Sequence, residues 1–224
     1  MRLLISLSLT LIAAALVLAN PAAAQTPRPC QALTPCTPVD GPWVTTASGE
    51  GQIYTVECPH GMVAVGSDAV FSGAIYPVGV DTGGGTIPGA ESQMSFALLS
   101  IPPGVHATFM PAVGCVTPGT VTVGFRPQAG AAPGTYRTRI RTVRIRPGVH
   151  LRVRHGCARG ERLVHSGAGV GFFTRRPPSS RIVKALHHRH DRTGSTTRTV
   201  ATGPPGVGDN ERVELQVTAI CAGS

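Results

Sequence analysis

The chain has few aromatic and few acidic residues, and it lacks the short motifs of common hydrolases. Aromatic residues make up 4% of the 224 residues, too few to interleave with basic strands as a base-stacking platform requires. No G-x-S-x-G, H-E-x-x-H or P-loop motif occurs. The sparse acidic residues form no pair suited to glycoside hydrolysis. We therefore expect a non-catalytic protein with no cofactor and no specific nucleic-acid recognition.

Long apolar runs are also absent beyond the N-terminus. Residues 3–18 form a mostly apolar run, Arg2 precedes it, and Ala22-Ala23-Ala24 offers a small-residue cleavage site after it. This run is too short, and too closely followed by the cleavage site, for a good membrane span. The pattern predicts a signal peptide over residues 1–24, no transmembrane segment, and a secreted, extracellular protein.

Helical periodicity is missing from every long window. Short β-branched runs are instead separated by clusters drawn from 28 glycines and 20 prolines. We predict an all-β fold, with two related, disulfide-stapled β-sandwich-like modules or one fused sandwich; a β-prism-like architecture is the alternative. The predicted limits are 25–126 for the first β module, 127–134 for a Pro- and Gly-rich linker, and 135–224 for a second, arginine-rich β module.

The cysteines favour disulfides, because all six follow the predicted cleavage site and none lies in a C-x-x-C motif. The pattern C-x-x-G-x-x-x-V-x-S-x-A begins at Cys58 and again 99 residues later at Cys157. Each copy closes on an apolar strand that ends in cysteine. If the first and last strands of a copy lie side by side, the disulfides are Cys58–Cys115, Cys157–Cys221 and, by what remains, Cys30–Cys36. The alternative is chance similarity among Gly- and Val-rich strands.

These openings also carry a resemblance. Cys58-Pro59-His60-Gly61 and Cys157-Ala158-Arg159-Gly160, with a valine four residues past each glycine, resemble secreted actinobacterial proteins of unknown function. Further segments look like the same family: 29–36, 41–44, 170–172 and 213–221. The resemblance implies secretion and a duplicated β module, and it carries over no activity.

Charge is divided unequally along the chain. Residues 25–130 contain two basic and six acidic residues, whereas residues 131–224 contain 17 basic and five acidic ones. Sixteen of the later cations are arginine. The second half therefore has a strong positive field.

Four of these arginines form a candidate anion-binding site. Strict alternation over 142–146 and 151–154, flanking a Pro-Gly turn, predicts a hairpin with one basic face: Arg144, Arg146, Arg152 and Arg154. Arg137, Arg139 and Arg141 alternate in the opposite phase, which predicts a bulge or a new strand near Thr142. Because like charges facing each other cost stability, an anionic partner such as teichoic acid, nucleic acid, an acidic polysaccharide or a lipid headgroup would relieve them. The alternative is a solvated face that protects the sheet from aggregation.

The remaining candidates are weaker. His188 and His190 share one side of a strand and form a weak metal candidate, but we expect the cluster to run into a hairpin tip at 191–194, between arms at 182–186 and 195–200. Asp81-Thr82-Gly83 resembles an aspartic protease loop without the second loop that this chemistry needs. His165 and Ser166 are adjacent, so on a strand they point apart, which is wrong for a base and its nucleophile.

The function that we expect is association with an anionic cell-envelope polymer or surface through the arginine-rich second half. The alternatives are a purely structural module without ligand, and a secreted hydrolase whose site is unidentified. The oligomeric state does not follow from the sequence.

Overall fold

The computed structural model describes residues 26–31, 35–45, 52–72, 78–81, 92–98, 108–119, 136–208 and 211–223. The predicted signal peptide and linker lie outside the described residues. Nearly all regular structure in these ranges is β-strand, with one short helix, α1 (Ser180–Ala185). The predicted all-β fold class is therefore confirmed. None of the described helices is long and apolar enough to cross a membrane.

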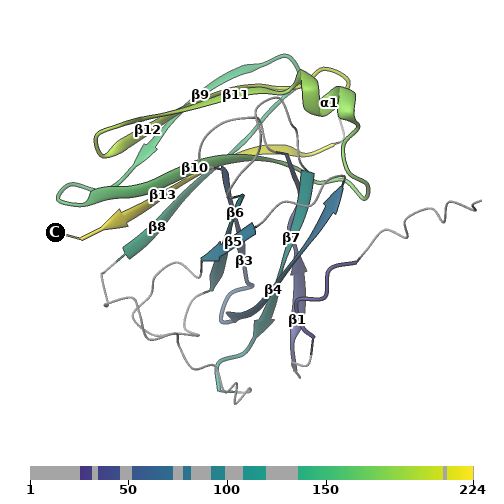
Figure 1. Ribbon diagram of the computed structural model, residues 1–224, viewed down its shortest axis with the longest axis vertical. Helices are drawn as coiled ribbons and strands as arrows, with labels where there is room; N and C mark the ends of the chain where they lie inside the picture. The colour runs from purple at the N-terminus through teal and green to yellow at the C-terminus, as the bar shows by residue number, and fades with distance from the viewer. Residues whose placement is uncertain are drawn as a thin grey trace, which may run out of the picture.

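The described strands form three antiparallel sheets (Figure 1). The seven-stranded central sheet contains β1 (Thr37–Asp40), β2 (Trp43–Thr45), β4 (Val63–Ser72), β7 (Thr108–Val116), β8 (Tyr136–Arg144), β10 (Arg162–Phe172) and β13 (Val213–Ala222). Its order is β1-β7-β2-β10-β13-β8. β1 and β2 pair with successive parts of one edge of β7, and β4 pairs with the opposite edge. The lower sheet is β3-β6-β5, and the upper sheet is β11-β12-β9. Their strands are β3 (Gln52–Glu57), β5 (Val78–Asp81), β6 (Gln93–Leu98), β9 (His150–Gly156), β11 (His187–Thr193) and β12 (Thr196–Thr202).

The upper and lower sheets pack on opposite faces of the central sheet. Along β10, Ala168, Val170 and Phe172 belong to the core beneath the upper sheet. The glycines between them face the lower sheet, where a Cβ on Gly169 would meet the Ile53 carbonyl oxygen at 3.2 Å. A second core joins Tyr54, Val56, Met94 and Phe96 of the lower sheet to β7, with members that include Phe109 and Val113. Each core therefore excludes water from one face of the central sheet.

All three predicted disulfides are present: Cys30–Cys36, Cys58–Cys115 and Cys157–Cys221. The second and third close two units, which we call the first unit (β1 to β7) and the second unit (β8 to β13). In both, the strand after the opening cysteine pairs with the strand that ends near the closing cysteine. The glycine three residues after each opening cysteine has a positive φ, 83° for Gly61 and 85° for Gly160, which a Cβ would oppose.

The two units also agree in strand register. Ala64 pairs with Cys115 and Leu163 pairs with Cys221, and a register shift follows immediately in both cases. In the outer sheets, residue 57 pairs with 93 and residue 156 with 196. Strand orders β3-β6-β5 and β9-β12-β11 therefore match strand for strand. A shared origin of the two units stays a prediction, as do the domain limits.

The units join within the central sheet. β2 of the first unit pairs with β10 of the second over three residues. Next to this junction, the Gln216 side chain accepts a hydrogen bond from Thr55 N at 2.5 Å and donates one to Thr55 O at 3.0 Å. The amide thus occupies the free edge of β3 as a neighbouring strand would. The β-sheet is continuous from one unit to the other.

Two sequence-based expectations about local structure are wrong. β8 and β9 form no hairpin, because β8 pairs with β13 in the central sheet and β9 pairs with β12 in the upper sheet. Neither a bulge nor a new strand occurs near Thr142, since β8 runs without a break from Tyr136 to Arg144 and keeps one register with β13. The arginines alternate in two phases because β8 is an edge strand of the central sheet. Arg139 and Arg141 lie on the face of β8 that is turned toward the upper sheet, and their side chains extend past the edge of the central sheet.

Candidate functional site

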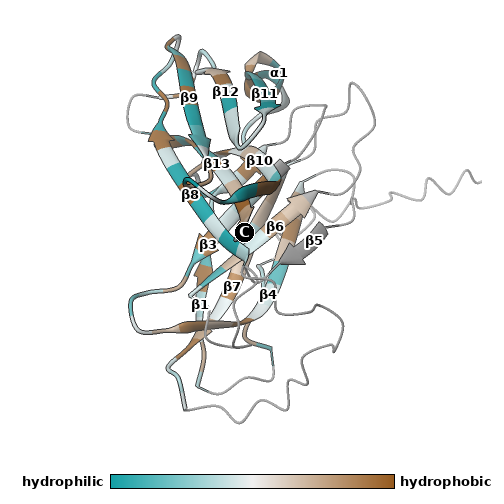
Figure 2. Cartoon of the chain, turned by 90° about the vertical axis from the view of Figure 1, so that its left-hand side faces the viewer, coloured by the Kyte–Doolittle hydropathy of each residue, from teal (hydrophilic) through white to brown (hydrophobic). Residues whose placement is uncertain are grey.

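Four arginines lie on the outward side of the upper sheet, and we call them the arginine face: Arg152 and Arg154 on β9, Arg189 on β11 and Arg198 on β12. Period-2 alternation places them there, because the intervening Val153 and Ala201 are buried against the central sheet. Figure 2 shows the resulting alternation of hydrophilic and hydrophobic segments along β9 and β12. The strands hold the four backbone positions fixed relative to one another.

Like charges meet directly on this face. Arg154 is the cross-strand partner of Arg198, and such pairs stand about 5 Å apart at the Cβ atoms. Arg198 in turn lies opposite Asp191, whose carboxylate accepts a hydrogen bond from Arg189 Nε at 2.9 Å. Arg198 Nε is buried and has no hydrogen-bond partner among the described residues. Four positive charges and one negative charge therefore share the face.

A fifth arginine supports the face from below. Arg141 Nη1, reaching from β8, donates a hydrogen bond to the Arg154 carbonyl oxygen at 3.0 Å. His155 on β9 contacts the Arg139 carbonyl oxygen through Nε2 at 2.8 Å. These bonds connect the edges of two sheets that share no backbone ladder at this point. They also place the Arg141 guanidinium beside the outer edge of β9.

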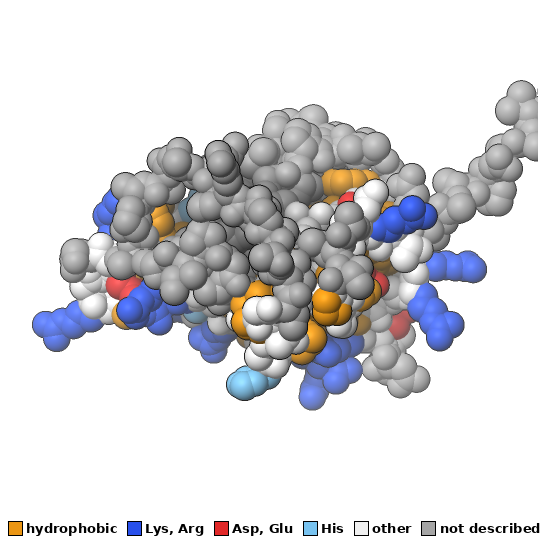
Figure 3. Space-filling model, turned by 90° about the horizontal axis from the view of Figure 1, so that it is seen from below, with side chains coloured by type: hydrophobic (Ala, Val, Ile, Leu, Met, Phe, Trp, Pro, Cys, Tyr) orange, Lys and Arg blue, Asp and Glu red, His pale blue; other side chains and the backbone are white. Residues whose placement is uncertain are grey.

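The four arginines predicted from the sequence do not share one face. Arg152 and Arg154 lie on the arginine face. Arg144 pairs in register with Glu214 in the central sheet, and Arg146 precedes the turn at Pro147 and Gly148. All four are exposed, but the separation of β8 from β9 sends them to different surfaces. Figure 3, which views the molecule from below, shows Lys and Arg side chains projecting around much of the outline.

Arg189 and Arg198 are the members that sequence reasoning missed. The alternation of residues in 187–193 and 196–202 could have identified them. It places Arg189 and Arg198 on one face only once these two segments are known to pair as strands. We instead expected residues 182–186 to be the first arm of that hairpin. They fall mainly in α1, which is N-capped by the Ser179 hydroxyl, and the hairpin is formed by β11 and β12 around Gly194.

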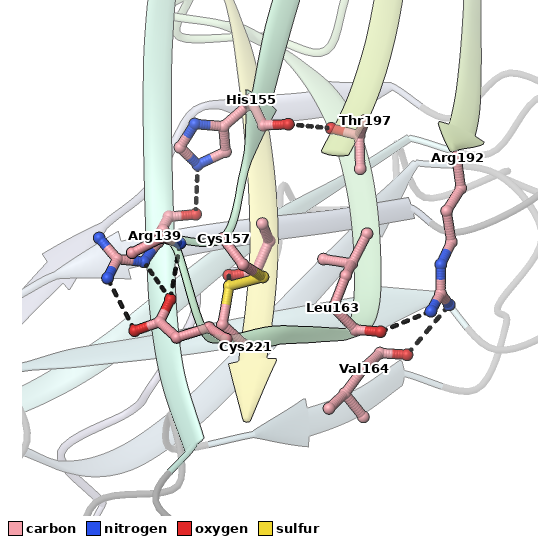
Figure 4. The surroundings of a disulfide bond; sticks show 11 residues. Arg139, His155, Cys157, Leu163, Val164, Arg192, Thr197 and Cys221 are labelled. Atoms are coloured by element: carbon pink, nitrogen blue, oxygen red, sulfur yellow. Dashed lines mark hydrogen bonds and ion pairs between the residues drawn. A yellow bond between two sulfur atoms is a disulfide. The ribbon is translucent and has the colours of Figure 1, made fainter. Parts of the chain in front are cut away.

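A second polar cluster surrounds the disulfide of the second unit (Figure 4). Arg139 donates two hydrogen bonds to the Glu161 carboxylate, at 3.0 and 2.9 Å. Arg139 and the Ala158 amide lower the pKa of Glu161. Glu161 lies near Cys157 and Cys221, the one group of possible metal ligands found among the described residues, but both sulfurs are in the disulfide and are not free thiolates.

The histidine pair lies on β11, which runs into the hairpin turn at Gly194 close to the predicted tip, and both side chains face the interior of the second unit. Burial, with the neighbouring His190 as a smaller cause, lowers the pKa of His188 to about 4, and its buried Nδ1 has no partner among the described residues. His190 contacts two hydroxyls: its Nε2 lies 2.9 Å from Ser166 Oγ, and its Nδ1 lies 2.8 Å from Thr199 Oγ1. Sequence reasoning missed this contact because Ser166 and His190 are 24 residues apart.

Asp81 is the last residue of β5, and the remainder of its motif, Thr82 and Gly83, lies outside the described residues. No protein-family model, curated protein or solved structure matches this chain. The geometry of the arginine face is therefore the main basis for assigning a function.

Proposed function

We propose that the protein is exported and binds an anionic cell-envelope polymer through the arginine face. The N-terminal signal pattern and the three disulfides support export. Arginine suits the ligand, because its planar guanidinium pairs with phosphate or carboxylate through two parallel hydrogen bonds.

The observation that carries this proposal is the direct opposition of Arg154 and Arg198. Two cations held opposite each other repel, and polyanion binding would relieve that repulsion. The corresponding positions of the first unit are Thr55 and Ser95, whose hydroxyls hydrogen-bond to each other at 2.8 Å. The backbone plan thus accommodates a neutral pair at these positions, and the second unit carries arginines instead.

Binding to heparin across a rising NaCl gradient tests the proposal, because each phosphate or sulfate contact releases counterions and makes affinity salt-dependent. The site variant replaces Arg152, Arg154, Arg189 and Arg198 with serine. The matched control replaces four exposed arginines outside the face with serine: Arg144, Arg146, Arg159 and Arg176. We expect the site variant to elute at much lower salt than the control.

Two outcomes would contradict this expectation. If both variants elute equally early, net charge and not the arginine face determines retention. If both elute with the wild type, the face is only a solvated surface and the purely structural alternative is favoured. Wall teichoic acid, as a second immobilised probe, then tests whether a phosphate polymer is held by the same residues.

A further inference from the structure

At two paired strand positions, the second unit has polar residues where the first unit has apolar ones. Phe96 on β6 pairs with Tyr54 and Val80, and the corresponding residue of β12, Thr199, pairs with Val153 and His190. Thus His190 and Thr199 occupy the positions of Val80 and Phe96. Phe96 is buried in the core of the first unit, which shows that this position accepts a large hydrophobic residue.

The polar residues form one hydrogen-bonded chain across three strands. Ser166 Oγ of β10 is 2.9 Å from His190 Nε2 of β11, and His190 Nδ1 is 2.8 Å from Thr199 Oγ1 of β12. Ser166 is 7% exposed, Thr199 is fully buried, and His190 is half-buried. A serine, an imidazole and an orienting hydroxyl are therefore in hydrogen-bond sequence, which is the arrangement that activates a serine nucleophile.

Apolar side chains at these positions would avoid the desolvation cost that the three polar groups offset only through their hydrogen bonds. The first unit keeps the serine as Ser67 but has neither the histidine nor the threonine. Polar residues are candidates for function where the other unit of the same chain has hydrophobic residues at the corresponding positions. This departure is separate from the arginine face, which lies on the opposite side of the upper sheet.

We infer that Ser166 is a nucleophile for acyl transfer from small esters, with His190 as its base and Thr199 as a positioning residue. Thr199 Oγ1 accepts the hydrogen bond of Nδ1–H, which leaves the Nε2 lone pair directed at the Ser166 hydroxyl. Ser166 Oγ attacks the ester carbonyl carbon while its proton moves to Nε2. The proton then passes to the departing alkoxide as the carbonyl re-forms, and water releases the acyl group from Ser166 by the same route.

Two features limit the substrate and the rate. Because Ser166 is only 7% exposed, we expect the acyl group to be small, such as acetyl. Thr199 carries no charge, so it orients the imidazole but gives the imidazolium none of the stabilisation that a carboxylate provides. We therefore expect slow turnover and a modified serine that persists long enough to be detected.

A fluorophosphonate probe that carries only small alkyl groups tests the inference on the full chain. Attack by Ser166 Oγ forms a phosphorus–oxygen bond and expels fluoride, and His190 takes the hydroxyl proton. We expect peptide mapping of the wild type to place the label on Ser166, at a rate that rises with pH because only a neutral imidazole can accept the serine proton. This mapping needs no variant, so it remains decisive even where a substitution prevents folding.

The variants then separate chemistry from structure. Ser166→Ala should abolish labelling, His190→Gln should reduce its rate by tenfold or more, and the matched Ser67→Ala change in the first unit should leave it unaltered. Label on other serines, labelling that is independent of pH, or no label on the folded wild type would overturn the inference. In those cases the chain of hydrogen bonds only joins the upper sheet to the central sheet. Heparin elution is measured in parallel, so failure here is distinguishable from failure of the proposed polymer binding.

Discussion

The two units share a backbone plan and differ in what the plan displays. Their strand orders, registers, turn glycines and closing disulfides correspond. The first unit has the buried residues Thr55 and Ser95 where the second has Arg154 and Arg198, and it has Val80 and Phe96 where the second has His190 and Thr199. The two units therefore keep the same backbone pairing, turn glycines and closing disulfide, while the residues at these paired positions differ.

The largest expected effect concerns the feature that the units share. Replacing both cysteines of one unit with alanine should lower the free energy of unfolding by about 4 kcal/mol, because loops of 57 and 64 residues lose similar closure constraints. The first-unit variant removes Cys58 and Cys115, and the second-unit variant removes Cys157 and Cys221. Denaturant unfolding measures both. A loss confined to one variant would show that the units are not equivalent in what holds them together.

The buried histidine should make the second unit sensitive to acid. Burial lowers the pKa of His188 to about 4 from an ordinary value of 6.5. Below pH 6.5 the unfolded chain therefore takes up this proton before the folded one, and stability falls as the pH drops toward 4. The loss amounts to about 3 kcal/mol when complete.

The substitution that gives the second unit the first unit's residue, His188→Val, tests this expectation, since Val78 occupies the corresponding position. The difference in unfolding free energy between variant and wild type should grow in the variant's favour from pH 7 to pH 4. His187→Val, on the exposed side of the same strand, is the control and should show no such growth. Parallel pH curves for all three proteins would show that His188 does not titrate in this way.

The sequence predicted what depends on local chemistry. Alternation and turn residues were sufficient for the all-β class but not for every strand, since residues 182–186 lie mainly in α1. The repeat of Cys58 and Cys157 was sufficient for the long disulfides. It failed where a strand's partner lies far along the chain. The segments around Arg144 and Arg152 alternate as the arms of a hairpin would, but β8 pairs with β13, about 80 residues away. Nothing in the sequence between Thr142 and Arg154 indicates that distant partner. Ser166 and His190 came together for the same reason.

Gly171 of β10 should be required for stability, because residues of the first unit pack directly against it. We do not expect the same requirement at the corresponding residue of the first unit. A Cβ on Gly171 would lie 2.5 Å from Pro42 Cγ and 3.0 Å from the Tyr54 hydroxyl. Gly171→Ala should therefore cost about 1–3 kcal/mol through overpacking. The corresponding residue of β4 is Ser72, and Ser72→Ala is the matched change, for which we expect a much smaller effect. Equal thermal stability of the two variants would mean that the sheets separate here at little cost.

The smallest change in unfolding free energy is expected when two residues of the arginine face are replaced by the corresponding residues of the first unit. Arg154→Thr combined with Arg198→Ser removes the opposed cations, and Asp191 keeps its hydrogen bond from Arg189. The free energy of unfolding should rise by about 0.2–1 kcal/mol at low salt, and the gain should shrink as salt screens the charges.

Arg144→Thr with Arg146→Ser removes the same net charge from other surfaces and is the control. An equal gain in the control would assign the effect to overall charge. A loss in the site variant would mean that Arg154 and Arg198 stabilise the sheet more through their aliphatic stems than they destabilise it by repulsion, which would remove the main physical reason for expecting an anion between them.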